Sequence, residues 1–324
     1  MKRTLILLAA FGLLLAASNP AHAFRYWGEK PLAMGGAYSA VADDVNTIHW
    51  NPAGLAFLNE RKQMGFLFNY ERYQHRLGDY QFLYPEEFED ENGDDDFGGD
   101  VFFNDETNVD LDKHMARDYL HFALADGYVW PLMTVGIAFT GLNFPMHTFS
   151  EGSDYEVDLA IANNIAGIFS WGGNFKYFDV HEESAGEFDM DLGILLDAVG
   201  IIGVGIVGRN LLGAEDEMVV RREVALGVAG HALEYATISV EGTKVFDVVD
   251  VPGTFNFGVG VEGKPAKVLA LRGGYNWDQV SSTRAWSLGL AYVDGFGALG
   301  GSFQSDVDEV KNIGFSFDLS LYFP

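Results

Sequence analysis

The sequence predicts an all-β fold, a transmembrane antiparallel β-barrel of about fourteen strands with an N-terminal hatch in its lumen. Apolar and polar side chains alternate with period two along most of the chain. The segments between these stretches alternate between tight turns and longer loops, as in bacterial barrels. After the N-terminal segment, no stretch reaches the run of about eighteen apolar residues that a spanning helix needs.

The first residues predict export. Two basic residues precede an apolar run over 5–17, and Ala-His-Ala at 21–23 matches the small-x-small pattern of a cleavage site. The run is too short to span a membrane, so we expect residues 1–23 to be a signal peptide and the mature chain to begin near Phe24. The chain has no cysteine, so its stability in an oxidising compartment has to come from burial and backbone pairing.

Residues 62–324 are expected to form the barrel. In 187–197, for example, Phe188, Leu192 and Ile194 fall on one face while Asp191 falls on the other. The segment 62–84 is taken as one long strand because splitting it gives an odd count. The expected strands are 62–84, 118–130, 132–142, 155–163, 165–180, 187–197, 200–209, 221–231, 236–246, 253–263, 267–277, 284–293, 296–304 and 312–323.

A soluble β-sandwich also alternates, but its strands average about five or six residues and its outward face is polar. Most of the strands expected here have the length of about nine to eleven residues that a tilted membrane strand needs. Aromatic residues near strand ends fit the girdle of a membrane barrel. The four residues expected in this girdle are Trp130, Trp277, Tyr292 and Tyr322.

Negative charge is concentrated in one segment. The net charge is -27, and residues 86–118 carry fourteen Asp or Glu against Lys113 and Arg117. We expect residues 85–117 to be a solvated first outer loop, and such charge argues against nucleic acid as a partner. Carboxylates at 90–96 leave weak calcium binding open, although the spacing of an EF-hand loop is absent.

Residues 24–61 are expected to form the hatch, because 24–58 show no strand pattern and contain the densest motif of the chain. From Met34 to Ala56 the sequence reads MGGAYSAVADDVNTIHWNPAGLA. Its small residues permit tight packing, and its Asp and Asn-Pro pairs favour turns. The candidates for anchoring or gating the hatch are Gly35, Gly36, Asp43, Asp44, Trp50, Asn51, Pro52 and Gly54.

This motif resembles the hatch of the FadL/TodX long-chain fatty-acid and hydrocarbon transporters. It is more similar still to the PorV/PorQ family, whose members share GMGGA, ADD and WNPAGL patterns, which this chain matches with MGGA at 34–37, ADD at 42–44 and WNPAGL at 50–55. The stretches LRGGYNW at 271–277 and SLGLAY at 287–292 also resemble the C-terminal half of PorV-type proteins. The resemblance implies a fourteen-stranded barrel in the cell outer membrane, surrounded by its lipid.

The sequence predicts no catalytic residue, no cofactor and no metal site. Two G-x-G-x-x-G matches, at 203–208 and 258–263, lie inside alternating strands rather than between a strand and a helix. The eight histidines are scattered singly. Ionisable residues on the polar faces are expected to pair across the lumen. These residues are Arg209, Glu223, Glu241, Glu262, Arg272 and Asp318.

Two functions, neither enzymatic, remain open at this stage. As FadL-type barrels do, the protein would pass hydrophobic small molecules across the outer membrane, which predicts an apolar pocket lined by Leu55 and Phe57 between hatch and wall. A fully packed polar lumen would count against this function. The alternative is a PorV-like accessory that docks or shuttles secreted proteins in a type IX secretion pathway.

Overall fold

The structure is a computed structural model in which fourteen antiparallel strands close into a barrel. This confirms the predicted fold class and strand number. The segment expected to be a signal peptide, 1–23, and most of the segment expected to be the acidic loop, 85–117, lie outside the described residues. The structure describes residues 28–76, 114–130, 133–142, 155–179, 186–198, 200–212, 221–232, 235–246, 253–278, 283–307 and 312–324.

Four short helices precede the strands. The helices are α1 (Glu29–Ala33), α2 (Thr47–Trp50), η1 (Pro52–Leu55) and α3 (Ala56–Arg61). The strands are β1 (Met64–Arg76), β2 (His114–Trp130), β3 (Met133–Leu142), β4 (Tyr155–Ile165), β5 (Phe169–Asp179), β6 (Glu187–Ala198), β7 (Ile202–Arg209), β8 (Glu223–Ala232), β9 (Ala236–Val245), β10 (Thr254–Ala266), β11 (Leu269–Asp278), β12 (Thr283–Val293), β13 (Gly297–Asp306) and β14 (Ile313–Phe323).

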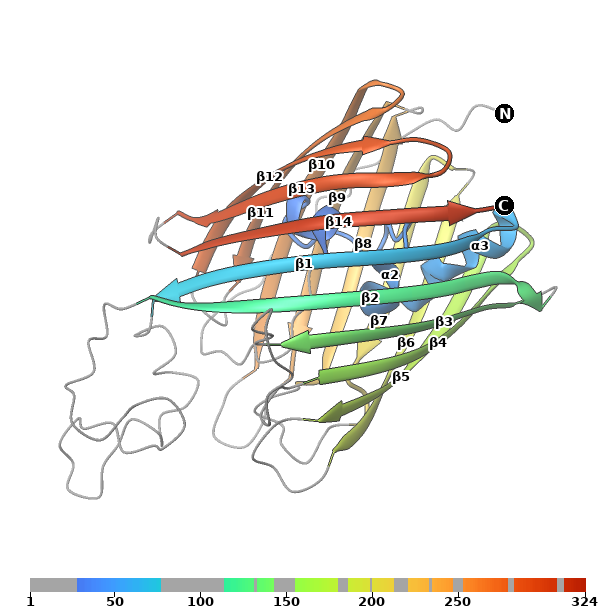
Figure 1. Cartoon of the computed structure of the whole chain (residues 1–324), viewed down its shortest axis with the longest axis horizontal. Coiled ribbons are helices and arrows are strands. Elements are labelled where there is room, and N and C mark those ends of the chain that lie inside the picture. The colour runs from blue at the N-terminus through green and yellow to red at the C-terminus, as the bar shows by residue number, and fades with distance from the viewer. Residues whose placement is uncertain are drawn as a thin grey trace.

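Every strand pairs with its neighbours in sequence, and β1 closes the ring by pairing with β14 (Figure 1). The closing register runs from Met64 opposite Phe323 to Gln74 opposite Ile313. Closure leaves no unpaired strand edge, which removes the backbone groups that would otherwise have to be satisfied in lipid.

Most strand bounds in the described residues differ from the prediction by one to four residues, and two of these differences matter here. The first strand starts at Met64 rather than residue 62, because α3 continues to Arg61 and Lys62 then adopts a left-handed conformation with φ 52°. The second strand begins at His114, so residues 114–117 are strand rather than the end of the acidic loop. These residues pair with β1. The sequence at the end of the acidic segment shows no pattern that predicts this pairing.

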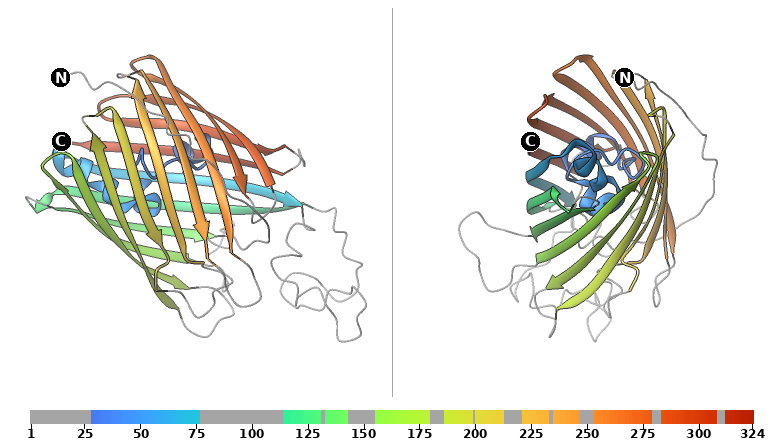
Figure 2. Two further views of the ribbon diagram at one scale, coloured as in Figure 1. Left: turned by 180° about the vertical axis from the view of Figure 1, so that it is seen from behind. Right: turned by 90° about the vertical axis from the view of Figure 1, so that its right-hand side faces the viewer.

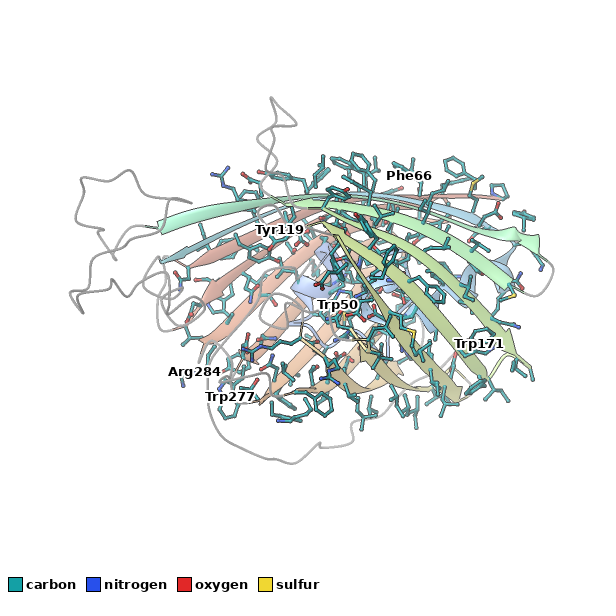
Figure 3. The ribbon with its side chains drawn as sticks, turned by 90° about the horizontal axis from the view of Figure 1, so that it is seen from below. Trp50, Phe66, Tyr119, Trp171, Trp277 and Arg284 are labelled. Carbon is teal, nitrogen blue, oxygen red and sulfur yellow. The ribbon has the colours of Figure 1, made fainter. Side chains whose placement is uncertain are left out.

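The alternating pattern separates the inside of the barrel from the outside. On β6, Phe188 is 71% exposed and Leu192 is 50% exposed, whereas Asp191 between them is fully buried. Trp50 lies in the middle of the interior in Figure 3, while Phe66 and Trp277 lie on the outer surface. The outward apolar belt and the inward polar face therefore follow the predicted period of two.

One residue of the expected aromatic girdle is placed differently. Trp277 and Tyr292 are exposed on the outer surface, with 43% and 51% of their area accessible. The prediction for Tyr322 was wrong: its ring lies 6.0 Å from that of Phe57 in the hatch. The period of two on β14 turns Tyr322 inward, next to Leu321 and Phe323, which face outward. The side chain of Trp130 lies outside the described residues.

Residues 28–61 lie inside the ring of strands, and both further views show these helices enclosed by the wall (Figure 2). Val45, Ile48, Leu55 and Leu58 are fully buried and form a core with small wall residues. The small residues come from β2, β3 and β4, namely Ala123, Ala125, Ala138, Ala160 and Ala162. The hatch therefore packs closely against the wall at this side.

Candidate functional site

The candidate site is the contact between the hatch and the inner wall. Gly35 and Gly36 follow α1 with φ of 60° and 76°, a region that residues with a Cβ rarely adopt. A Cβ on Gly35 would also lie 2.6 Å from the backbone nitrogen of Tyr275 in β11. Glycine is therefore required here both for the turn and for the close approach of the hatch to the wall.

Glycines of the wall make the same approach from the other side. A Cβ on Gly260 of β10 would lie 2.5 Å from the carbonyl oxygen of Met34, and one on Gly203 of β7 would lie 2.6 Å from that of Ala40. Both glycines belong to the G-x-G-x-x-G matches of the sequence. Close packing of two backbones accounts for them.

Asn51 joins the hatch to β6. Its Nδ2 donates to the carbonyl oxygens of Ser39, at 2.9 Å, and of Ile194, at 3.1 Å. Its Oδ1 accepts from the backbone nitrogen of Ala53 at 3.2 Å, which caps η1, and Pro52 occupies the first turn of that helix. One buried amide thus holds the turn, the hatch and the wall together.

Trp50 and Gly54 lie at the crossing of hatch segments. The Trp50 ring meets the Tyr38 ring edge-on at 6.1 Å, and the Arg209 guanidinium lies 5.2 Å from its centroid. The Trp50 carbonyl oxygen accepts from Arg209 Nη2 at 3.0 Å. A Cβ on Gly54 would collide with the carbonyl oxygen of Ala42, so this crossing requires glycine.

Three of the predicted lumen residues form one polar group with the hatch. Arg209 Nη1 lies 3.0 Å from Glu223 Oε2, and its Nη2 lies 3.5 Å from Glu241 Oε1. Glu241 accepts from the backbone nitrogens of Tyr38, at 3.0 Å, and Ser39, at 2.7 Å. Backbone donors and a guanidinium together satisfy this buried carboxylate.

Of the other three lumen residues, Asp318 accepts from the backbone nitrogen of Glu29 at 3.1 Å and from Asn46 Nδ2 at 3.0 Å. Glu262 and Arg272 form a second group, centred on Arg272. Its Nε lies 2.8 Å from Glu262 Oε2, and its Nη1 donates to the Glu29 carboxylate of α1. Lys30 Nζ lies 2.7 Å from Asp43 and 3.6 Å from Glu262. Arg272, Glu262, Glu29 and Lys30 are buried, so each charge depends on the others for compensation.

Burial and ion pairing oppose each other at Lys30 and Asp43. Burial favours the neutral forms, but the Asp43 and Glu262 carboxylates outweigh it and raise the pKa of Lys30. For Asp43, the Lys30 ammonium outweighs burial and holds the pKa below its usual range. Burial and the Asp43 charge instead raise the pKa of Asp44, whose Oδ1 accepts from the backbone nitrogen of Asn46 at 2.8 Å.

Asp43→Asn is expected to lower hatch stability at neutral pH by an amount that disappears in acid. Because the folded pKa of Asp43 is depressed, its contribution is present above the unfolded pKa of about 3.9 and is lost as the pH falls through the folded pKa. The measurement is hydrogen exchange of the hatch amides in both proteins between neutral pH and about pH 3. A difference that grows on acidification would contradict the pairing with Lys30.

A group that the sequence did not predict lies between α2 and β4. His49 Nδ1 lies 3.4 Å from Glu156 Oε1 and 3.8 Å from Asp158 Oδ2. One ligand atom of each residue lies within 4.8 Å of the other two, a spacing that can hold a metal ion. Alternation places Glu156 and Asp158 on one face of β4, but nothing local connects them to a histidine more than a hundred positions earlier.

A cavity of about 440 Å³ opens where the tight turns lie. Phe57, Val41 and Leu195 contribute apolar area to its lining. Its charged residues are Arg61, Lys264, Asp43, Glu60, Asp197 and Glu262. The prediction of an apolar pocket lined by Leu55 and Phe57 is only half met, because Leu55 is fully buried in the core between hatch and wall. This cavity has an apolar part and a charged part.

Among the described residues, no helix is long and apolar enough to cross a membrane.

No protein-family model and no curated protein matches the sequence. Among solved structures, the fold is similar to that of a FadL homologue from Pseudomonas aeruginosa, with a TM-score of 0.61 and 10% identity over 94% of this chain and 99% of that one. A triple-mutant porin of Rhodopseudomonas blastica gives a TM-score of only 0.40 at 9% identity, over 81% of this chain and 99% of that one. With its closed ring of fourteen strands, the chain thus has a FadL-like barrel fold.

Proposed function

We propose that this protein is an integral barrel of the cell outer membrane. The outward apolar belt carries this proposal, because contiguous exposed apolar surface of this extent requires contact with lipid or protein. Strand length can be compared with the width of a membrane. β1, β3 and β10 have 13, 10 and 13 residues, β2 has 17, and β7 is shorter with 8. A tilted strand needs about nine to eleven residues to cross the hydrocarbon core.

We infer further that the hatch closes the lumen and that hydrophobic small molecules pass it. The cavity supports this, because its volume of about 440 Å³ lies in the range of small-molecule sites. Phe57 and Val41 offer contacts to an apolar chain, while the charged side chains of the lining offer contacts to a polar head group. An amphiphile such as a long-chain fatty acid combines both parts.

The alternative is that the protein docks or shuttles secreted proteins in a type IX secretion pathway. The hatch motif favours this function, because its MGGA, ADD and WNPAGL stretches resemble the PorV/PorQ family more closely than the FadL/TodX transporters. The densely packed contact between hatch and wall is compatible with it, because a docking protein does not need an open lumen. Genomes that encode this protein without any type IX sorting domain would argue against this alternative.

A deletion strain distinguishes the two functions. Under the transport proposal, uptake of a labelled long-chain fatty acid or alkane falls while secretion stays normal; build-up of exported proteins in the periplasm with normal uptake would establish the docking function instead.

Complementation with Ala236→Trp tests the cavity, since Ala236 lines it. We expect about a tenfold loss of uptake, because a bulky side chain fills the space for the ligand. Ala266→Trp at the neighbouring hairpin is the matched control, because Ala266 is exposed. Equal uptake with both variants would contradict passage through this cavity.

A further inference from the structure

His49 of the hatch and Glu156 and Asp158 of the wall are spaced like the ligands of one metal ion. Four ligands at about 2.0–2.1 Å around a tetrahedral ion lie roughly 3.3–3.5 Å apart. His49 Nδ1 is 3.4 Å from Glu156 Oε1 and 3.8 Å from Asp158 Oδ2. Small side-chain movements would bring all three atoms to one ion, with water as a fourth ligand.

The two carboxylate oxygens that face His49 lack hydrogen bonds. Within the described part of the chain, Glu156 Oε1 and Asp158 Oδ2 accept none, although both atoms are buried. The residues themselves are 6% and 0% exposed. Buried carboxylate oxygens are costly without a partner, so this pair calls for a proton or a cation between them.

The surroundings orient the pair toward His49. Asn174 Nδ2 donates to Asp158 Oδ1 at 2.6 Å, which leaves Oδ2 as the atom that faces the imidazole. The His121 ring packs edge-on against the His49 ring at 4.7 Å, and its Nδ1 lies 2.8 Å from Thr140 Oγ1. Such outer contacts are typical of metal sites, where they hold the ligands in one orientation.

The charge of the cluster favours a divalent cation. Glu156, Asp158 and Asp191 are buried together with Lys176, whose Nζ lies 2.8 Å from Asp191 Oδ2. Among these four described residues, three ionised carboxylates and one ammonium carry a net charge of two negative units. An imidazole nitrogen among the ligands favours Zn²⁺ and related transition metals over Mg²⁺ or Ca²⁺.

We propose that His49, Glu156 and Asp158 bind one divalent transition-metal ion of the Zn²⁺ type, which links hatch helix α2 to wall strand β4. The ion fixes the hatch at the wall, so its removal loosens the hatch without opening the barrel. This inference is independent of the molecule that the barrel passes or docks.

The test is zinc binding by the purified full-length protein in detergent after treatment with a chelator. We expect about one tightly bound Zn²⁺ per chain, measured by elemental analysis after removal of free metal. His49→Gln and Asp158→Asn are each expected to weaken binding at least about tenfold, because loss of a ligand costs no less than loss of an outer-shell partner. Chelation is expected to speed hydrogen exchange in the hatch of the wild type but not of His49→Gln.

His231→Gln is the matched control, because His231 lies in the wall and contacts Thr237 at 3.1 Å. It should bind zinc like the wild type. A shift in gel migration on heating tests whether each variant retains its folded barrel. We expect this shift in His49→Gln as well, because the substitution affects only the hatch. If zinc binds equally to wild type, His49→Gln and Asp158→Asn, the ion binds at another place and the proposal fails. Absence of tight zinc binding in the wild type would also overturn the proposal. A proton shared between the carboxyl groups of Glu156 and Asp158 would then explain their burial.

Discussion

Arg272→Met is expected to destabilise the docked hatch by about 3–5 kcal/mol, because it leaves the buried carboxylates of Glu29 and Glu262 without their shared cation. Glu29 is 3% exposed and Glu262 is also 3% exposed, so water cannot replace the guanidinium without movement of the hatch. The opening equilibrium of the hatch should rise roughly a hundredfold or more. Hydrogen exchange of the α1 amides, followed by mass spectrometry, measures this rise.

Arg284→Met is the matched control. Arg284 lies on the neighbouring strand β12 and is exposed, so the same substitution removes no buried cation from the contact between hatch and wall, and exchange of the α1 amides should stay as in the wild type. A second test adds Glu29→Gln to Arg272→Met, which removes the charge of one of the two carboxylates that lose the guanidinium and should recover part of the loss. Unchanged hatch exchange in Arg272→Met would show that this group does not hold the hatch.

Gly260→Val is expected to displace the hatch by steric collision, at a cost of about 3 kcal/mol. A Cβ on Gly260 would lie 2.5 Å from the carbonyl oxygen of Met34 and 2.9 Å from its Cα, and backbone atoms cannot rotate away as a side chain can. Ion conductance of single barrels in a planar bilayer should therefore increase, because an undocked hatch leaves the lumen less filled.

Gly263→Val on the same strand is the control for β-propensity and for added apolar area. A Cβ there would have no atom within 4 Å, so valine should be tolerated. Equal conductance of the two variants would mean that the hatch does not seal the lumen, which would weaken the transport proposal directly.

The polar contacts and the glycine contacts hold the same segment by different means. Arg272 and Arg209 each join wall carboxylates to the hatch, while Gly203 and Gly260 let backbones meet directly. The attraction within an ionic group weakens when one of its side chains loses its charge, whereas contact between two backbones does not depend on charge. The ionic groups are therefore the part of the site that a ligand or a pH change can loosen.

Much of the fold was predictable from the sequence because strand formation in a barrel leaves a local signal. Side chains of β6 alternate between lipid and lumen, and Phe188 and Asp191 show the pattern within a few residues. The errors had two causes. Residues 114–117 pair with β1 directly after the acidic segment, where the prediction extended the loop. Tyr322 follows the alternation of β14 and faces inward, although aromatic residues also favour membrane interfaces.

The site was predictable only in part. Its motif glycines and Asn51 stand out as turn residues in the sequence, and the lumen charges follow from alternation. Which hatch residue meets which charge did not follow, because Ser39 and Glu241 are separated by 202 positions. The same holds for His49 and β4, which only the folded hatch brings within 3.4 Å of each other.

By itself, the sequence determined the closed antiparallel barrel, its strand number and the polarity of its two faces, because these properties depend on residues adjacent along one strand. Only the tertiary structure decided how the hatch lies in the lumen and which charges it pairs with. Those contacts depend on the depth at which the hatch meets each strand, a quantity that no local pattern encodes.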